Sequence, residues 1–242
     1  MDILYERRLE ERKEALKDFF GASEGNEVPE EFLKRICQFE ELMLKYRSAI
    51  REVTTKLEIL NDELSSTADR NPIESIQSRI KRPYSIAGKL SRKNLPVTVE
   101  AISKNLNDVA GIRVVCPFID DIYQIAGMLL RQDDVRLISQ KDYIRHPKEN
   151  GYRSLHLIIE IPVFFSMGSE MIRVEIQIRT VAMDFWASLE HQIRYKNESP
   201  ELQLIAEELK SCADTIAQTD EKMQQLRKWI DGKKAEQRRE KD

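Results

Sequence analysis

The segment 171–180, MIRVEIQIRT, alternates apolar and polar side chains at every second position. Successive side chains of a β-strand point to opposite faces, so one face here would carry the branched residues Ile172, Val174, Ile176 and Ile178. Such a face must be buried, and the pattern therefore predicts a central strand with one side in the core. The opposite face would carry Arg173, Glu175, Gln177 and Arg179. It could be a solvated sheet surface or the floor of a polar site, and the strand alone does not decide between them.

The composition favours a helix-rich protein with one sizeable core. Of the 242 residues 33% are charged and only 8 are glycine, and the net charge of −3 gives no overall basic field for duplex DNA. The cysteines Cys37, Cys116 and Cys212 are odd in number and far apart, which argues for a reducing compartment and against a disulfide framework or a zinc site. The first residues lack the apolar core of a signal peptide, and no apolar run reaches the roughly 20 residues that span a bilayer. We expect a cytoplasmic protein that does not enter membranes.

Two long stretches carry apolar residues in alternating steps of three and four, the spacing of a helix that packs along one seam. The first runs from Phe32 to Leu64 and would be about 50 Å long at ~1.5 Å per residue. The second, in a last helix expected over 200–231, consists of Ile205, Leu209, Cys212, Ile216, Met223, Leu226 and Ile230. The two helices could pack on each other or on the core, or they could form an oligomer interface. Residues 2–20 are a further predicted helix, 21–29 a linker and 232–242 a frayed tail.

Between the long helices the sequence predicts a small sheet with shorter helices. The expected helices lie at 73–80, from Pro83 onward, at 98–106, at 120–131 and at 181–195. The expected strands lie at 112–118, 135–139, 155–161 and 171–180, the last two joined by a hairpin that contains Gly168 and Ser169, and 141–154 is a polar loop. This order predicts the α+β class, with a central mixed or antiparallel sheet flanked by helices and long helices at both ends. The predicted division is an N-terminal helical extension, 1–69, a core, 70–197, and a C-terminal helix and tail, 198–242.

The segment 79–93 is a basic patch in a chain that is acidic overall. Its six basic residues, with no acidic one among them, are Arg79, Lys81, Arg82, Lys89, Arg92 and Lys93. Pro83 would begin a helix, which places Ser85 in the first turn, where free N–H groups and a hydroxyl suit phosphate. Lys89 follows four residues later on the same face. The segment is either a phosphate site or a solvated basic helix.

Two acidic residues in the predicted sheet, Asp108 and Glu175, have positive neighbours. Two carboxylates on adjacent strands suit Mg²⁺ when substrate phosphates complete its coordination, and one of them can take a proton from an attacking hydroxyl. Tyr152 lies in the polar loop, where a base could stack on it, or it is a core tyrosine. The chain has no G-x-x-x-x-G-K-[ST], H-E-x-x-H or C-x-x-C motif. Together these residues indicate phosphoryl-type transfer between two nucleotides.

Four segments resemble the synthetase domain of the RelA/SpoT family, in matching order and spacing, over about residues 70–230. They are R-I-K-x-x-x-S-I-x-x-K-L-x-R-K, D-V-A-G-I-R-V-V-C, K-E-N-G-Y-R-S-L-H and V-E-I-Q-I-R-T-V-A-M-D-F-W-A-S-L-E-H. The length, with no hydrolase domain or regulatory tail, is similar to that of the small alarmone synthetases. The segments A-M-D-F-W-A-S-L-E-H and K-D-Y-I-x-x-P-K-x-N-G-Y-R-S-L-H-L-I-I-E resemble the RelP type.

This resemblance implies a nucleotidyltransferase-like fold and a pyrophosphokinase that moves the β,γ-pyrophosphate of ATP to the 3′-hydroxyl of GDP or GTP, giving (p)ppGpp and AMP. Asp108 and Glu175 would hold Mg²⁺, and Glu175 would also be the base for the 3′-hydroxyl. On the ATP side the implied residues are Arg79 and Arg113, on either face of adenine, and Lys81, Ser85, Lys89 and Arg92 on the phosphates. On the acceptor side they are Tyr152, stacked on guanine, with Lys148, Asn150, His156 and Gln177, and nearby Lys141 and Arg179.

The family often forms tetramers, so the resemblance also implies a homotetramer through the terminal helices. The segment 139–142 half matches the R-x-K-D pattern of long family members, so no preference for GDP over GTP is inferred. Two alternatives remain: a non-catalytic nucleotide or single-stranded RNA binder on the same fold, and a helical scaffold, which would leave the 141–154 loop unexplained. The paired acids favour the enzyme, because without a metal they would repel phosphate. Regulation by RNA or by product nucleotide is possible and leaves no mark in the sequence.

Overall fold

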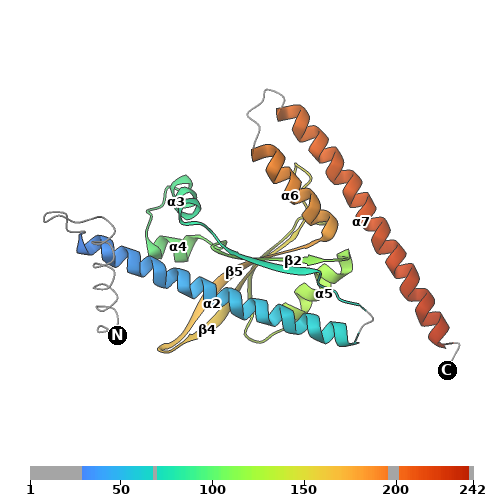
Figure 1. The fold of residues 1–242 in the computed structure, drawn as a ribbon, viewed down its shortest axis with the longest axis horizontal. Coiled ribbons are helices and arrows are strands. Elements are labelled where there is room, and N and C mark those ends of the chain that lie inside the picture. Colours follow the sequence, from blue (N-terminus) through green and yellow to red (C-terminus); the bar gives the residue numbers. More distant parts are fainter. Residues whose placement is uncertain (1–28, 68–69, 196–201, 240–242) are drawn as a thin grey trace, which may run out of the picture. The chain divides into compact units, whose positions relative to one another are not determined.

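The computed structural model describes residues 29–67, 70–195 and 202–239 (Figure 1). The helix predicted over 2–20 lies outside the described residues, as does the predicted linker up to residue 28. The described helices are α2 (Glu30–Thr67), α3 (Pro83–Arg92), α4 (Val99–Asn105), α5 (Ile119–Leu130), α6 (Val181–Tyr195) and α7 (Leu202–Arg239). The strands are β1 (Ser75–Ile80), β2 (Ala110–Cys116), β3 (Arg136–Asp142), β4 (Leu155–Phe165) and β5 (Gly168–Thr180).

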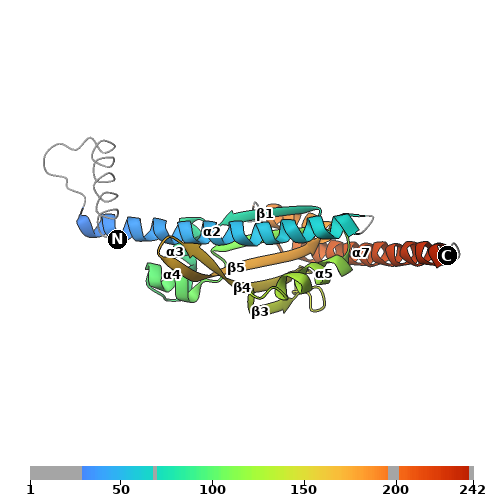
Figure 2. The same cartoon turned by 90° about the horizontal axis from the view of Figure 1, so that it is seen from below.

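All five strands form one sheet in the order β1-β2-β5-β4-β3, with β1 and β3 at opposite edges (Figure 2). The central pair β2 and β5 is parallel and the other pairs are antiparallel. The β4–β5 hairpin closes at Phe165 and Gly168, so its turn is Ser166 and Met167 rather than the predicted Gly168 and Ser169. The predicted α+β class, a mixed sheet flanked by helices with long helices toward both ends, is confirmed.

The helix predicted over 73–80 is wrong, because residues 75–80 form the edge strand β1. A segment this short is a poor helix on its own, whereas pairing with β2 along its whole length gives its backbone partners. Just before the strand, the Ile73 amide donates to Oδ1 of Asn61 and of Asn71, at 3.2 Å in each case. Asn71 therefore closes a turn that leads into the strand.

The other predicted elements are found, most of them with shifted ends, and α6 has the predicted bounds 181–195. Thr98 caps α4 through a bond from the Ala101 amide at 3.2 Å, and Thr180 caps α6 through a bond from the Met183 amide at 3.1 Å. β3 runs to Asp142, so the polar loop begins at residue 143. The tail predicted to fray is helical through residue 239, since α7 continues to that point.

The apolar face of β5 is buried, as its alternation predicts. Its four branched residues, Ile172, Val174, Ile176 and Ile178, are each at most 7% exposed. Helix α5 packs against β2 and β5 and buries Ile122, Ile125 and Leu129. Because burying one such side chain contributes roughly 1.5–3 kcal/mol, this layer fixes β5 in the sheet and leaves its other face available for polar groups.

The two long helices bury different kinds of residue. The predicted seam of α2 is buried at Met43, Tyr46, Ile50, Val53, Leu57 and Leu60. In α7 the predicted seam is only half-buried at Ile205, Leu209 and Ile216, and it is exposed at Cys212, Met223, Leu226 and Ile230. The described side chains that α7 buries are Ala213, Asp220 and Gln224, and this helix packs on α6 and α5. For α7 the alternative in which the seam packs on the rest of the chain is therefore not found at Cys212, Met223, Leu226 and Ile230, and the alternative of an oligomer interface stays a prediction.

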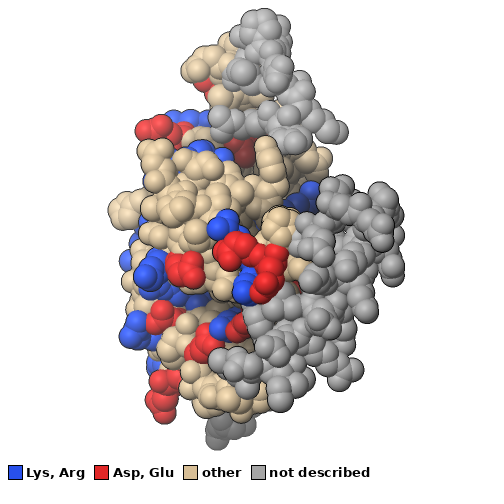
Figure 3. Space-filling view, turned by 90° about the vertical axis from the view of Figure 1, so that its left-hand side faces the viewer, with Lys and Arg blue, Asp and Glu red and all other residues tan. Residues whose placement is uncertain are grey.

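Within the described residues the chain forms two compact units that do not follow sequence order. One consists of residues 29–48 and 82–106, and the other of 49–81 and 107–239, which include the whole sheet. The predicted three-part division along the sequence stays a prediction. None of the described helices is long and apolar enough to cross a membrane. On the face drawn in Figure 3, basic and acidic side chains lie intermixed.

Candidate active site

The strand registers bring polar residues of all five strands together on the face of the sheet opposite the apolar one. Directly paired residues share a face, and one row across the sheet consists of Gln77, Arg113, Gln177, His156 and Lys141. The next row consists of Arg79, Gly111, Glu175, Ile158 and Ser139. Residues predicted for the donor, the acceptor and the metal therefore meet on adjacent strands. This arrangement favours the interpretation of the polar face of β5 as the floor of a site.

Glu175 lies where two hydrogen-bonded chains from Arg179 converge. In the first chain Arg179 Nη2 donates to Gln177 Oε1 at 2.5 Å, and Gln177 Nε2 donates to Glu175 Oε2 at 3.0 Å. In the second chain Arg179 Nη2 donates to the Tyr152 hydroxyl at 2.9 Å, which lies 2.8 Å from His156 Nε2. His156 Nδ1 lies 3.5 Å from Glu175 Oε1 and closes the ring. In such a ring each side chain fixes the orientation of the next.

The ring also determines the tautomer of His156. A carboxylate can only accept, so Nδ1 carries the hydrogen that faces Glu175. In the neutral imidazole Nε2 accepts from the Tyr152 hydroxyl, whose oxygen accepts in turn from Arg179. The Gln177 amide is oriented by the same logic, with its oxygen toward Arg179 and its nitrogen toward Glu175. Both chains therefore present donors to Glu175.

These donors keep Glu175 ionised. Burial works to raise the pKa of Glu175, but hydrogen bonds from His156 and Gln177 outweigh it, and the pKa falls below the ordinary glutamate value. Burial is the main cause of the raised pKa of Tyr152 and of the lowered pKa of Arg179. At neutral pH the centre of the site is thus a carboxylate, and the phenol of Tyr152, which is joined to it through His156, is neutral.

Asp108, just before β2, is the second predicted acid. Lys81, just after β1, lies 2.7 Å from it between Nζ and Oδ2, and the two side chains are 19% and 18% exposed. The charge of Asp108 also works to raise the pKa of Glu175, but it does not reverse the lowering described above. Among the described residues no group of three or more His, Cys, Asp or Glu could hold a metal ion. Asp108 and Glu175 stay predicted ligands of Mg²⁺, and their chemistry suits this ion, because it usually takes one or two carboxylates with water and substrate phosphates.

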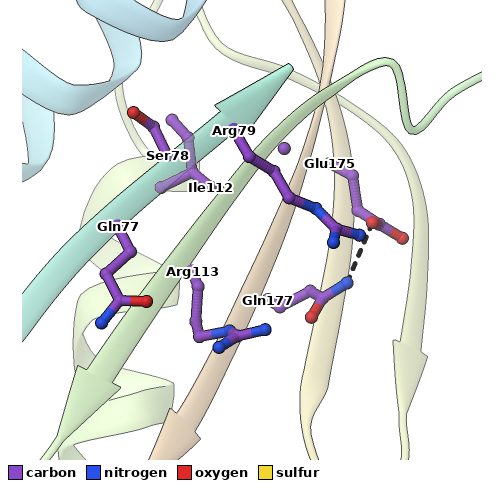
Figure 4. Close-up of a pocket in the computed structure, with 8 residues that line it drawn as sticks. Gln77, Ser78, Arg79, Ile112, Arg113, Glu175 and Gln177 are labelled. Atoms are coloured by element: carbon purple, nitrogen blue, oxygen red, sulfur yellow. Dashed lines mark hydrogen bonds between the residues drawn. The ribbon is translucent and has the colours of Figure 1, made fainter. Parts of the chain in front are cut away.

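Toward β1 the sheet is hollowed into a cavity of about 170 Å³ (Figure 4). It is lined by Gln77, Ser78, Arg79, Gly111, Ile112, Arg113, Glu175 and Gln177. Arg79 and Arg113 extend from neighbouring strands toward Glu175 and Gln177 in Figure 4. Both guanidiniums are planar groups on which a purine can stack, so this cavity suits a nucleobase.

Loop 143–154 supplies an aromatic surface on the other side of Glu175. The rings of Tyr143, Tyr152 and His156 meet edge to face with centroids 5.2–6.1 Å apart. Lys148 Nζ lies 4.7 Å from the Tyr143 ring centre and 4.8 Å from that of Tyr152. The Asn150 side chain accepts from the Tyr152 amide at 3.2 Å and donates to Glu190 at 3.2 Å. Tyr152 is half-buried among polar groups, which differs from a tyrosine of the apolar core.

The remaining predicted residues lie at the margin of the sheet or in the other compact unit. Lys141 is exposed near the end of β3, in the same row as His156. Ser85, Lys89 and Arg92 belong to α3, where Pro83 is the first helical residue, so Ser85 lies in the first turn as predicted. They are not among the residues that line the described cavity.

Sequence reasoning missed three residues that complete the site. Asp184, in the first turn of α6, lies 3.3 Å from both Arg113 Nη1 and Arg179 Nη1 and so joins the two sides. Tyr143 packs on Tyr152, and its place in the same polar loop could have drawn attention to it. Gln77 was hidden by the wrong helix assignment, because only a strand places it in a row with Arg113.

Comparison with known proteins identifies the class. Residues 78–200 match the model of the region found in RelA / SpoT proteins. The chain is 44% identical over 189 residues to the GTP pyrophosphokinase YwaC of Bacillus subtilis (strain 168), which covers 78% of this chain and 90% of that relative. The chain belongs to the RelA/SpoT family.

Within that family the solved structures point to one group. The small alarmone synthetase 1 of Bacillus subtilis bound to its product pppGpp superposes with a TM-score of 0.73 at 36% identity, over 80% of this chain and 98% of that one. The same synthetase bound to AMPCPP gives a TM-score of 0.67 at 32% identity, over 80% and 98%. The chain is therefore similar to the small alarmone synthetases in sequence and in fold.

Proposed function

We propose that this chain is a (p)ppGpp synthetase that transfers the β,γ-pyrophosphate of ATP to the 3′-hydroxyl of GDP or GTP. The observation that carries the proposal is the place of Glu175, an ionised carboxylate between the cavity of Arg79 and Arg113 and the aromatic surface of Tyr152. Similar proteins support it, since one is a GTP pyrophosphokinase and another was solved with pppGpp and with the ATP analogue AMPCPP.

On the donor side, adenine would lie between Arg79 and Arg113, whose guanidiniums stack well on a purine. The phosphates would be bound by Lys81, Ser85, Lys89 and Arg92. Lys81 already neutralises Asp108 at 2.7 Å, so it can exchange that partner for a phosphate oxygen when ATP and a metal ion arrive.

On the acceptor side, guanine would stack on Tyr152, where Lys148 Nζ now lies 4.8 Å from the ring centre. Lys148 would move toward the acceptor phosphates, and Asn150, His156 and Gln177 would offer polar groups to the base and ribose, with Lys141 and Arg179 nearby. Ring stacking of this kind contributes about 1–3 kcal/mol per base.

The reaction makes one bond and breaks one. The 3′-oxygen bonds to the β-phosphorus of ATP, the bond from that phosphorus to the α,β-bridging oxygen breaks, and AMP leaves. Glu175 would accept the proton of the 3′-hydroxyl. A carboxylate of low pKa is a weak base, yet it suffices when the transition state is largely dissociative and positioning supplies most of the rate. Bound by Asp108 and Glu175, Mg²⁺ would neutralise charge on the transferred phosphates.

Three further expectations belong to this proposal. The segments around Met183–Trp186 and Lys141–Leu155 favour the RelP type. The exposed residues Met223, Leu226 and Ile230 of α7 give apolar surface to a homotetramer. The synthetase would act in the cytoplasm, on ATP and GDP or GTP.

The test is incubation of the purified protein with ATP, GDP and magnesium, followed by separation of the nucleotides by anion exchange. We expect ppGpp and AMP in equal amounts, pppGpp when GTP replaces GDP, and no product without magnesium. Asp108→Asn serves as a control, because it keeps the side chain's shape and should bind GDP but form little product. Binding of both nucleotides with no product from the wild type would favour the inactive binding module instead.

A further inference from the structure

The acceptor loop, residues 143–154, is packed directly against the C-terminal helix α7. Gly151 is buried at φ 88°, and a Cβ placed on it would lie only 2.5 Å from the Cβ of Ala213. Two residues further along, Arg153 Nη2 lies 3.7 Å from the carboxylate of Asp214. Gly151 stands between Asn150 and Tyr152, so the backbone that α7 touches is the backbone that carries the acceptor groups.

The same helix holds the end of β5, next to Arg179. Thr180 Oγ1 donates to Asp220 Oδ2 at 2.6 Å, and both residues are buried. Arg179 belongs to the ring around Glu175 and bonds the Tyr152 hydroxyl at 2.9 Å. A shift of α7 can therefore move Tyr152 in two ways, through the backbone of the loop and through the end of β5.

Helix α7 is itself anchored on both sides of this contact. On one side Trp186 Nε1 donates to the Leu209 carbonyl at 2.8 Å. On the other, Gln224 accepts from the Asp120 amide at 3.1 Å and donates to its carboxylate at 2.9 Å. The stretch that faces the loop lies between these anchors, so a change of volume there acts on the loop before it dislodges the helix.

We propose that α7 positions the acceptor loop, and that Ala213 and Asp214 are positioning residues that set the affinity for the acceptor nucleotide without touching it. The inference rests on the proposed function. A loop without regular structure is held in place by its contacts, and Gly151 has no side chain that could yield to pressure from Ala213. The residues that line the donor cavity come from β1, β2 and β5 and include none from this loop, so a displacement of the loop should weaken acceptor binding far more than donor binding.

The experiment compares Ala213→Leu with Thr215→Leu in the full-length protein. Leucine at 213 adds bulk toward Gly151, whereas residue 215 is exposed on the same helix. For Ala213→Leu we expect the Kd and KM for GDP to rise about ten-fold or more, since displacements near 1 Å can cost two orders of magnitude, and the Kd for AMPCPP and KM for ATP to stay the same. Thr215→Leu should bind both nucleotides like the wild type, and the nearly isosteric Ala213→Ser should retain acceptor affinity.

A second pair of variants tests the contact by charge instead of volume. Asp214→Lys places a cation beside Arg153 and should raise the Kd for GDP, while Asp231→Lys makes the same charge change farther along α7, where Asp231 pairs with Arg227 at 2.7 Å. The inference is overturned if Asp214→Lys binds GDP like the wild type, or if either loop-facing variant loses GDP and AMPCPP affinity equally. A wild-type protein that binds GDP and AMPCPP but makes no (p)ppGpp would defeat the proposed function alone, because the binding comparison still reports on the loop.

Discussion

The proposed acceptor and donor sides of the candidate site differ in how many of their side chains are bonded to one another. On the acceptor side Tyr152, His156, Gln177 and Arg179 already form a closed ring of hydrogen bonds with Glu175, and Arg179 is only 2% exposed. On the donor side Arg79 is an exposed side chain of an edge strand, and the predicted phosphate ligands of α3 belong to a different compact unit.

Preassembly changes what binding costs. Groups fixed by their neighbours lose little conformational freedom when a ligand arrives, whereas long exposed side chains must be ordered at that moment. We therefore expect acceptor-side substitutions to disturb the whole ring and to be non-additive with one another. Donor-side substitutions should act locally and add to those across the site.

The largest effect is expected at the residue shared by both sides. Glu175→Gln keeps the length and an acceptor oxygen but removes the charge, so turnover should fall by about 10²–10⁴, the range for loss of a general base. GDP and AMPCPP should still bind, because the partners Gln177 and His156 remain. Turnover from single-turnover assays and affinity from calorimetry measure the two quantities. Near-normal turnover would remove Glu175 from the chemical step.

A smaller effect is expected at Tyr152. Tyr152→Ala should weaken GDP binding by about ten- to a hundred-fold, the loss of one stacked base, with little change in AMPCPP binding. Tyr152→Phe keeps the stacking surface but removes the hydroxyl that links Arg179 to His156. It should bind GDP nearly as well and turn over more slowly. Equal losses of both nucleotides in Tyr152→Ala would contradict the assignment to the acceptor side.

On the donor side the expected loss is smaller again. Arg79→Ala should weaken AMPCPP binding about three- to thirty-fold, the range for one cation–π contact, and should leave GDP binding unchanged. In a double-mutant cycle Arg79→Ala and Tyr152→Ala should be additive, whereas Tyr152→Ala and Gln177→Ala should not, since only the second pair shares the ring through Arg179. Strong coupling between Arg79→Ala and Tyr152→Ala would show that the two sides do not bind their nucleotides independently.

The sequence predicted the parts of the site whose geometry depends on local pattern. Strict alternation at 171–180 places Glu175 and Gln177 on one face, and the burial of Ile172 to Ile178 follows from the same alternation. The prediction for the segment 73–80 was wrong because its apolar and polar residues do not alternate strongly. Residues 75–80 become a strand by pairing with β2. Such pairing is a property of the assembled sheet and leaves little trace in six residues.

The sequence did not predict which side chains that are far apart in the chain are in contact in the fold. Nothing local indicates that Asp184 bridges Arg113 and Arg179, or that Ala213 abuts Gly151. The heptad spacing of α7 predicted an apolar seam but left its partner open, and the described side chains that the helix buries are Ala213, Asp220 and Gln224. The periodicity of a sequence predicts that a helix has an apolar face, whereas the element that packs on this face depends on the tertiary fold.

The smallest effect is expected at Asp220, which bonds Thr180 where α7 contacts the end of β5. A substitution here separates the contribution of packing at this contact from that of charge. Burial raises the pKa of Asp220 despite the bond from Thr180. At a pH between the ordinary aspartate pKa and this raised pKa, Asp220 is protonated in the folded protein and ionised in the unfolded chain. The stability of the folded protein should therefore fall as pH rises from the ordinary aspartate pKa through the raised pKa.

The variant Asp220→Asn retains an oxygen that can accept from Thr180 and cannot ionise. Its Tm should match that of the wild type near pH 4 and exceed it by a few degrees at pH 7. Thermal unfolding across that range measures the difference, and a gap that narrows as pH rises would mean that Asp220 is stabilised in its ionised form. Because Asp220→Asn keeps an acceptor for the Thr180 hydroxyl, it should leave GDP affinity intact, which separates the charge of this contact from its geometry.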